Sequence, residues 1–284
     1  MQWEDGRESE NVEDRRGLAP KAGMALGGGS LLVILLVWLL GGDPKEVMRQ
    51  QADQQDVPME RQQIPPGQEH LVKFVKVTLG YTEDVWEDQF RRMGKTYRKP
   101  KLVLFTGQVK SACGFASAAM GPFYCPPDEH VYIDLQFFDD LQKRFKAPGD
   151  FAQAYVIAHE VGHHVQNQLG ISERVHAQKS RLSEAEANRL SVRLELQADY
   201  LAGVWAHHIQ KTKRVLDPGD LEEALRAANA IGDDMLQKRA RGHVVPDSFT
   251  HGTSAQRIRW FRRGFETGDV EGMHQLFKLR YEEL

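Results

Sequence analysis

The sequence predicts a mostly helical α+β domain with a small β-sheet, preceded by one N-terminal transmembrane helix. Three observations support this prediction. Residues 22–42 form an uncharged apolar run, the segments after residue 150 repeat apolar residues at helical spacing, and residues 101–105 and 130–135 are the best strand candidates. The 284 residues are 41% hydrophobic and 27% charged, which suits one globular domain of about 200 residues with extensions.

The apolar run of residues 22–42 is long enough to cross a bilayer core of about 30 Å. A packed core helix is the alternative, because glycines weaken the hydrophobic signal. A cleaved signal peptide is less favoured, since a long polar region precedes the run. More positive charges lie before the run than close behind it. The positive-inside rule then places the N-terminus in the cytosol and the following domain outside the cytoplasmic membrane, in the periplasm or another extracytoplasmic space.

The segments on either side of this run are polar. Residues 1–21 mix acidic and basic residues with few apolar ones, which predicts a disordered cytoplasmic tail. Residues 43–68 are rich in glutamine and proline, and we expect a polar linker that lifts the domain off the membrane. A short interaction helix is the alternative there. The domain itself is expected to comprise residues 69–284.

Most of the predicted elements of this domain are helices, and two are strands. Thr82 is a candidate N-cap, Pro148–Asp150 should break the chain before a helix, and Thr253 or Ser254 should cap the last helix. Strands are expected at residues 101–105 and 130–135, and helices at residues 70–79, 82–93, 137–145, 150–168, 183–210, 221–239 and after residue 253.

Cys113 and Cys125 are the two cysteines of the chain, and the loop between them contains glycines. This loop can bring them together. In an exported domain they would form a disulfide that stabilises the fold by roughly 2–3 kcal/mol. Free buried thiols are the alternative. Ligation of zinc by these cysteines is disfavoured, because the C-x2-C spacing is absent.

The sequence HEVGH, residues 159–163, has the pattern His-Glu-x-x-His on a predicted helix. Side chains four residues apart lie about 6 Å from each other on one helix face, so His159 and His163 can form two corners of a zinc tetrahedron. Glu160 can then take a proton from a zinc-bound water and pass it to a leaving amine. The same short motif also arises by chance on ordinary helices.

A third ligand is needed, and Glu195 in the segment RLELQADYLAG is the candidate. Asp199 follows one turn later, where it can accept a hydrogen bond from a ligating histidine. A solvated helix face is the alternative, but the flanking residues are strongly apolar. A third histidine ligand in the HExxHxxGxxH pattern is excluded, because Gln166 and Leu169 occupy the required positions.

Four segments carry a resemblance to a known family: HEVGHHVQNQLG, ELQADYLAG, GPFYCPPD and SFTHGTSAQRIRWF. From the N-terminal anchor to about Gly268, the chain resembles the putative neutral zinc metallopeptidase family of bacterial membrane-anchored proteins. The HExxH and ExxxD pair also resembles the glutamate-zincins. The resemblance implies a zincin-like metallopeptidase domain with Zn²⁺ on His159, His163 and Glu195. It further implies that the strand at residues 130–135 offers its edge to an extended substrate, with an ordinary core strand as the alternative.

The resemblance also assigns roles to His251 and Arg257. It implies that His251 donates to the oxyanion of the reaction and that Arg257 orients carboxylates beside the ligands. Gly252 stands where these relatives usually have proline, and a loop histidine with a surface arginine is the alternative. The basic and aromatic residues 259–263 fit a helical core stripe with solvated arginines. Together with a net charge of −3, this argues against nucleic acid as a partner.

We therefore predict a membrane-anchored zinc metallopeptidase that hydrolyses peptide bonds in peptide or protein substrates, with Glu160 as general base. A non-catalytic zinc-containing envelope scaffold or binding protein is the first alternative. An envelope protein without zinc, in which the motif is fortuitous, is the second. The residues leave the substrate sequence and the oligomeric state open.

Overall fold

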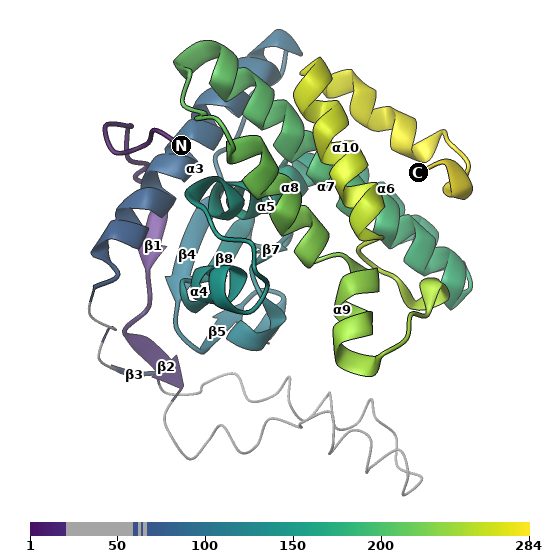
Figure 1. Ribbon diagram of the computed structural model, residues 1–284, viewed down its shortest axis with the longest axis horizontal. Coiled ribbons are helices and arrows are strands. Elements are labelled where there is room, and N and C mark those ends of the chain that lie inside the picture. Colours follow the sequence, from purple (N-terminus) through teal and green to yellow (C-terminus); the bar gives the residue numbers. More distant parts are fainter. Residues whose placement is uncertain (21–58, 62–63, 65–66) are drawn as a thin grey trace, which may run out of the picture.

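A computed structural model describes the chain except residues 21–58, 62–63 and 65–66. It has a mostly helical α+β fold, as predicted, with a small mixed sheet (Figure 1). The helices are α3 (Glu69–Arg92), α4 (Gln136–Lys143), α5 (Asp150–Gln168), α6 (Ile171–Lys179), α7 (Glu184–Lys213), α8 (Asp220–Ala230), α9 (Asp233–Arg241) and α10 (Ser254–Thr267). The strands are β1 (Val12–Asp14), β2 (Leu18–Pro20), β3 (Met59–Arg61), β4 (Lys101–Phe105), β5 (Gln108–Ser111), β6 (Gly114–Ser117), β7 (Phe123–Cys125) and β8 (His130–Asp134).

The main sheet has the strand order β1-β4-β8-β7. Strands β1, β4 and β8 are parallel, and β7 runs antiparallel to β8. Both predicted strands are confirmed as β4 and β8. However, β8 is paired on both sides, so the prediction that it offers a free edge to a substrate is wrong. The short strand β7 takes the edge position instead.

Helix α3 joins two segments for which separate helices were predicted. Thr82 does not cap a second helix, because its hydroxyl donates to the carbonyl of Leu79, 2.7 Å away, inside the continuous helix. Gly80 lies at the predicted break, and a Cβ there would stand 2.5 Å from the carbonyl oxygen of Arg7. Glycine at this position therefore allows the backbone near Arg7 to approach α3 closely, and it does not end the helix.

The helix predicted at residues 221–239 is in fact two helices, α8 and α9. The chain breaks at Gly232, where a Cβ would lie 2.5 Å from the backbone nitrogen of Ser254. The predicted starts of two later helices are confirmed. Ser183 forms a capping box at the start of α7, and Thr253 forms one at the start of α10.

Close helix crossings hold the helical layer together. A Cβ at Gly162 of α5 would lie 3.0 Å from the carbonyl oxygen of Ala198 in α7. Where α7 meets α10 the approach is closer still, since a Cβ at Gly203 or at Gly264 would stand 2.0 Å from a carbonyl oxygen of the facing helix. These crossings fix α7 tightly between α5 and α10 (Figure 1).

The prediction that residues 1–21 form a disordered tail is wrong for residues 1–20. Strand β1 pairs with β4 in the main sheet, and Met1 and Trp3 are buried in the same hydrophobic cluster as Phe74 of α3. The Met1 nitrogen lies 2.7 Å from Asp150 Oδ1 at the start of α5. The segment is polar in composition. The burial of Met1 and Trp3 and the pairing of β1 with β4 nevertheless hold it on the domain.

The membrane-related predictions fall mostly on residues outside those described. The expected transmembrane span, residues 22–42, lies there entirely, as does most of the expected linker, residues 43–68. From that linker, residues 59–61 form β3, which pairs with β2. Within the described part of the chain, every helix is too short or too polar to cross a membrane.

Candidate metal centre

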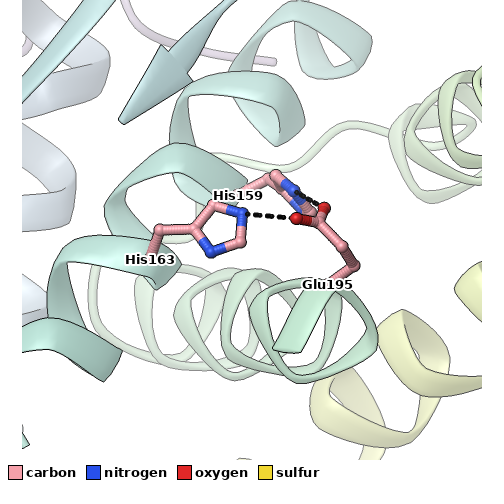
Figure 2. Close-up of side chains that lie close together, drawn as sticks. All are labelled: His159, His163 and Glu195. Atoms are coloured by element: carbon pink, nitrogen blue, oxygen red, sulfur yellow. Dashed lines mark hydrogen bonds and ion pairs between the residues drawn. The ribbon is translucent and has the colours of Figure 1, made fainter. Parts of the chain in front are cut away.

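Helices α5 and α7 bring His159, His163 and Glu195 together, as the sequence predicted (Figure 2). The Nε2 atom of His159 lies 3.2 Å from Glu195 Oε2, and that of His163 lies 3.4 Å from Glu195 Oε1. All three donor atoms lie within 4.8 Å of one another. This spacing is short enough for one cation to contact all three.

The Nδ1 atom of each imidazole is hydrogen-bonded to another side chain. Asp199 Oδ1 lies 2.8 Å from His159 Nδ1, and Gln166 Oε1 lies 2.9 Å from His163 Nδ1. Gln166 is itself held, because its amide nitrogen donates to the carbonyl of Leu194 on α7. Both histidines therefore direct Nε2 toward the centre with a fixed tautomer. Two imidazole nitrogens and one carboxylate oxygen form a donor set that suits zinc.

The protonation of these groups is coupled. Burial alone would lower the pKa of His163, but the Glu195 carboxylate raises it to about 9. Burial would raise the pKa of Glu195, and His163 and His159 hold it well below its usual range instead. Each imidazole and the Glu195 carboxylate thus favour the charged form of the other. Since zinc needs neutral imidazoles, its binding releases protons.

Glu160 follows the first of these histidines and is buried, and it lines the same cavity as the three donor residues. Burial raises the pKa of its carboxyl group, while the neighbouring His159 and His163 act in the opposite direction. A carboxylate with a raised pKa is a better proton acceptor near neutral pH than an exposed one. This environment suits a general base.

Arg257 is buried, so the alternative of a surface arginine is wrong. Its Nε donates to Asp199 Oδ2 at 2.8 Å and its Nη2 to Asp199 Oδ1 at 3.0 Å. Burial would raise the pKa of Asp199, but Arg257 and His159 lower it to about 2. Asp199 therefore stays ionised and orients His159.

Tyr155 is a further residue of this site that was not predicted from the sequence. It donates its hydroxyl to Asp199 Oδ1 at 2.5 Å. It lies four residues before His159 on the same helix, which is the signal that could have found it.

His251 is half-exposed at the wall of the cavity. Its Nδ1 lies 3.1 Å from Asp233 Oδ1, while Asp233 Oδ2 accepts the backbone N–H groups of Thr250, His251 and Gly252. The hydrogen bond to Asp233 raises the pKa of His251. Asp233 thus fixes both the loop and the imidazole, and leaves Nε2 for another partner. No local sequence pattern indicates this role of Asp233.

Comparison with known proteins agrees with this geometry. Residues 1–275 match the family described as "Putative neutral zinc metallopeptidase". The chain belongs to this family. The resemblance drawn from the four sequence segments is therefore confirmed, and the family name fits the donor set of two histidines and one glutamate.

Related proteins occur in bacteria. The chain is 50% identical to "Uncharacterized protein YpfJ" of Escherichia coli (strain K12) over 282 residues, covering 95% of this chain and 96% of that protein. It is 39% identical over 250 residues to "Uncharacterized protein Mb2605" of Mycobacterium bovis and "Uncharacterized protein Rv2575" of Mycobacterium tuberculosis, covering 81% of this chain and 82% of each. No solved structure matches. The zincin-like description of the fold therefore stays a prediction.

The metal centre of this metallopeptidase-family chain opens into a cavity of about 1070 Å³. His159, Glu160, His163, Glu195 and His251 all line it. One wall of this cavity is apolar and includes residues of β7. That wall is formed by Met120, Gly121, Pro122, Phe123, Tyr124, Phe137 and Phe145, among others.

Strand β7 is hydrogen-bonded to α5, the helix that carries His159 and His163. Asn167 of α5 donates to the hydroxyl of Tyr124 at 3.0 Å, and this hydroxyl lies 3.0 Å from His164 Nδ1. His164 Nε2 in turn lies 2.6 Å from the carbonyl oxygen of Arg98. Both ring nitrogens of His164 thus face partners other than the three donor residues. The edge strand and α5 therefore form one rigid unit.

The predicted disulfide between Cys113 and Cys125 is confirmed. Cys113 lies at the turn of the β5–β6 hairpin, and Cys125 ends β7. The bond fastens the hairpin to the strand that borders the cavity. It therefore helps to define the apolar wall.

Proposed function

We propose that this chain is a zinc-dependent metallopeptidase that hydrolyses peptide bonds in peptide or protein substrates. The observation that carries the proposal is the convergence of His159, His163 and Glu195 at a cavity that also contains the buried Glu160. Structural zinc sites are normally closed by four protein ligands, whereas catalytic sites keep a position open. A three-residue donor set that faces a cavity favours the enzyme over a scaffold with structural zinc.

A bound zinc ion supplies Lewis-acid chemistry, since it polarises a carbonyl and makes water acidic enough to attack near neutral pH. Glu160 then acts as the base that accepts a proton from the attacking water. The same carboxyl group returns that proton to the leaving amine nitrogen. Its burial beside the ligands keeps bulk water from competing for these transfers.

His251 is proposed to stabilise the negative charge that develops on the carbonyl oxygen. The Asp233 carboxylate accepts from His251 Nδ1 and raises the pKa of the imidazole, which favours the imidazolium, and in that form Nε2–H can donate into the cavity. Arg257 has a different task, because its guanidinium is used by Asp199. It positions the ligand His159 through that carboxylate and keeps the site charged and rigid.

The substrate is proposed to bind as an extended chain along β7. This strand is paired with β8 on one side and ends the main sheet as described. An extended peptide could complete its backbone hydrogen bonds, with side chains directed at the apolar wall of the cavity. The uncharged run of residues 22–42 supports membrane association, and the disulfide supports an oxidising compartment for the domain.

Metal removal tests the proposed reaction. The purified full-length protein should contain about one zinc per chain and should cut unfolded polypeptides such as denatured casein. A chelator should abolish cleavage and added zinc should restore it. Cleavage that persists after complete metal removal would contradict a metal-dependent reaction. Stoichiometric zinc without cleavage of any unfolded polypeptide would favour the scaffold.

The role of His251 can be tested through Asp233. Asp233→Asn keeps an oxygen for the backbone N–H groups but removes the negative charge beside His251 Nδ1, so the imidazolium that donates through Nε2 is less populated. We expect kcat/KM to fall about 10–100-fold, as for other outer partners of site histidines, with unchanged zinc content. Asp234→Asn is the matched control, because Asp234 bonds to Ser254 instead. Equal losses in both variants would show a general defect of the α9 start and not a specific role.

A further inference from the structure

The N-terminal segment is an integral part of the folded domain. The carbonyl of Asn11 accepts the N–H of Leu102, and Arg15 donates its N–H to the carbonyl of Leu104, each at 2.8 Å. These bonds continue the β1–β4 ladder at both ends. On the other side, Trp3 packs edge-on against Phe74 of α3, with ring centroids 5.2 Å apart. Residues 1–15 therefore lie against both the main sheet and α3.

Helix α3 carries a charged site that holds this segment. Glu83 is only 1% exposed, and its carboxylate accepts hydrogen bonds from Arg7 Nη2 at 2.8 Å, Ser9 Oγ at 2.5 Å and Asn11 Nδ2 at 2.7 Å. All three donors come from the N-terminal segment. A carboxylate buried without such partners would be strongly destabilising. The buried carboxylate of Glu83 is therefore stabilised only when residues 7–11 pack against α3.

The backbones also approach closely at two glycines. A Cβ at Gly6 would lie 2.4 Å from Val77 Cγ1, and one at Gly80 would lie 2.5 Å from the carbonyl oxygen of Arg7. Between them, Ser9 donates its backbone N–H to the carbonyl of Lys76 at 3.0 Å. Backbone bonds, buried charge and close packing all act along the same face of α3.

These contacts constrain the membrane topology of the whole chain. A single crossing by residues 22–42 would place residues 1–20 and residues 69–284 on opposite sides of about 30 Å of hydrocarbon. Two helical crossings would need roughly 40 predominantly apolar residues, whereas residues 43–58 contain several charges. We propose that residues 1–20 and the domain lie on the same side of the membrane, held together by the Glu83 site. This proposal is an alternative to the predicted arrangement, in which the N-terminus is cytosolic and the domain is external.

Accessibility of two surface positions tests this proposal in the full-length chain. Glu10→Cys and Glu282→Cys place thiols at exposed positions near the two ends. Cells that produce each variant are treated with a membrane-impermeant maleimide before and after permeabilisation, and the labelling of the wild-type chain is subtracted. We expect both thiols to react in the same condition, either before permeabilisation or only after it. Labelling of one before and the other only after permeabilisation would overturn the proposal.

A charge reversal tests the Glu83 site itself. Arg7→Glu places a second carboxylate beside Glu83, and the Tm of the purified full-length protein should fall by about 5–10 °C. Glu10→Lys changes the charge of the same segment at an exposed position and should shift Tm by less than about 1 °C. An unchanged Tm for Arg7→Glu would mean that the segment is not held at Glu83 and would refute the docked arrangement.

Discussion

Replacing Glu160 with glutamine should lower the rate of peptide hydrolysis by about 10²–10⁴-fold, the usual contribution of a general base. The amide has nearly the same shape as the carboxylate but cannot accept the proton of the attacking water. Because Glu160 is not among the three converging donors, zinc content and Tm should remain nearly unchanged. The measurement is paired: zinc per chain and cleavage rate, for the variant and the wild type.

Glu173→Gln provides the matched control, since Glu173 also lines the cavity but lies on α6. It should retain close to full activity. A second readout is restoration of function in a strain that lacks the gene. If the Glu160→Gln protein carries full zinc and still restores function, the centre is structural and the hydrolase proposal fails.

Removal of the third ligand should have the second large effect. Glu195→Ala leaves two imidazoles, which hold zinc poorly, so the purified variant should lose its metal on dialysis. The loss of affinity should exceed the about 10–100-fold that follows removal of an outer hydrogen-bond partner. Zinc affinity is measured by competition with a chelator of known strength, and zinc content by elemental analysis.

Glu184→Ala is the control for this substitution. Glu184 lies at the exposed start of the same helix α7, so its removal tests for a general effect of losing one negative charge. Its zinc affinity should equal that of the wild type. Full metal occupancy of Glu195→Ala at unchanged affinity would mean that the third ligand is misassigned.

Local helix geometry explains why the centre could be predicted from the sequence. A spacing of four residues fixes the relative positions of His159 and His163, and the same spacing links Glu195 with Asp199. Once each pair lies on a helix, a single crossing of α5 and α7 is enough to assemble them. Gly162 permits that crossing, because a side chain there would press on Ala198.

Residues whose roles depend on distant contacts could not be predicted. Asp233 matters because the loop before α10 folds back onto the start of α9. Strand β7 has three residues, too few to show the alternation that marks a strand, so the sequence does not indicate the strand that pairs with β8 at the edge of the sheet. The docking of the N-terminal segment depends on its pairing with β4 and on the buried carboxylate of Glu83, and both lie far along the chain from residues 1–20.

The crossing of α7 and α10 has a consequence for anyone who wishes to make this protein more heat-resistant. Exchanging a helical glycine for alanine ordinarily gains about 0.5–1 kcal/mol, because alanine favours the helix and restricts the unfolded chain. At Gly203 and Gly264 the sign is reversed, since the new methyl group would stand 2.0 Å from a backbone oxygen. The helices would have to separate, and Arg257 would move away from Asp199. Variant libraries for thermostabilisation should therefore leave these two glycines untouched.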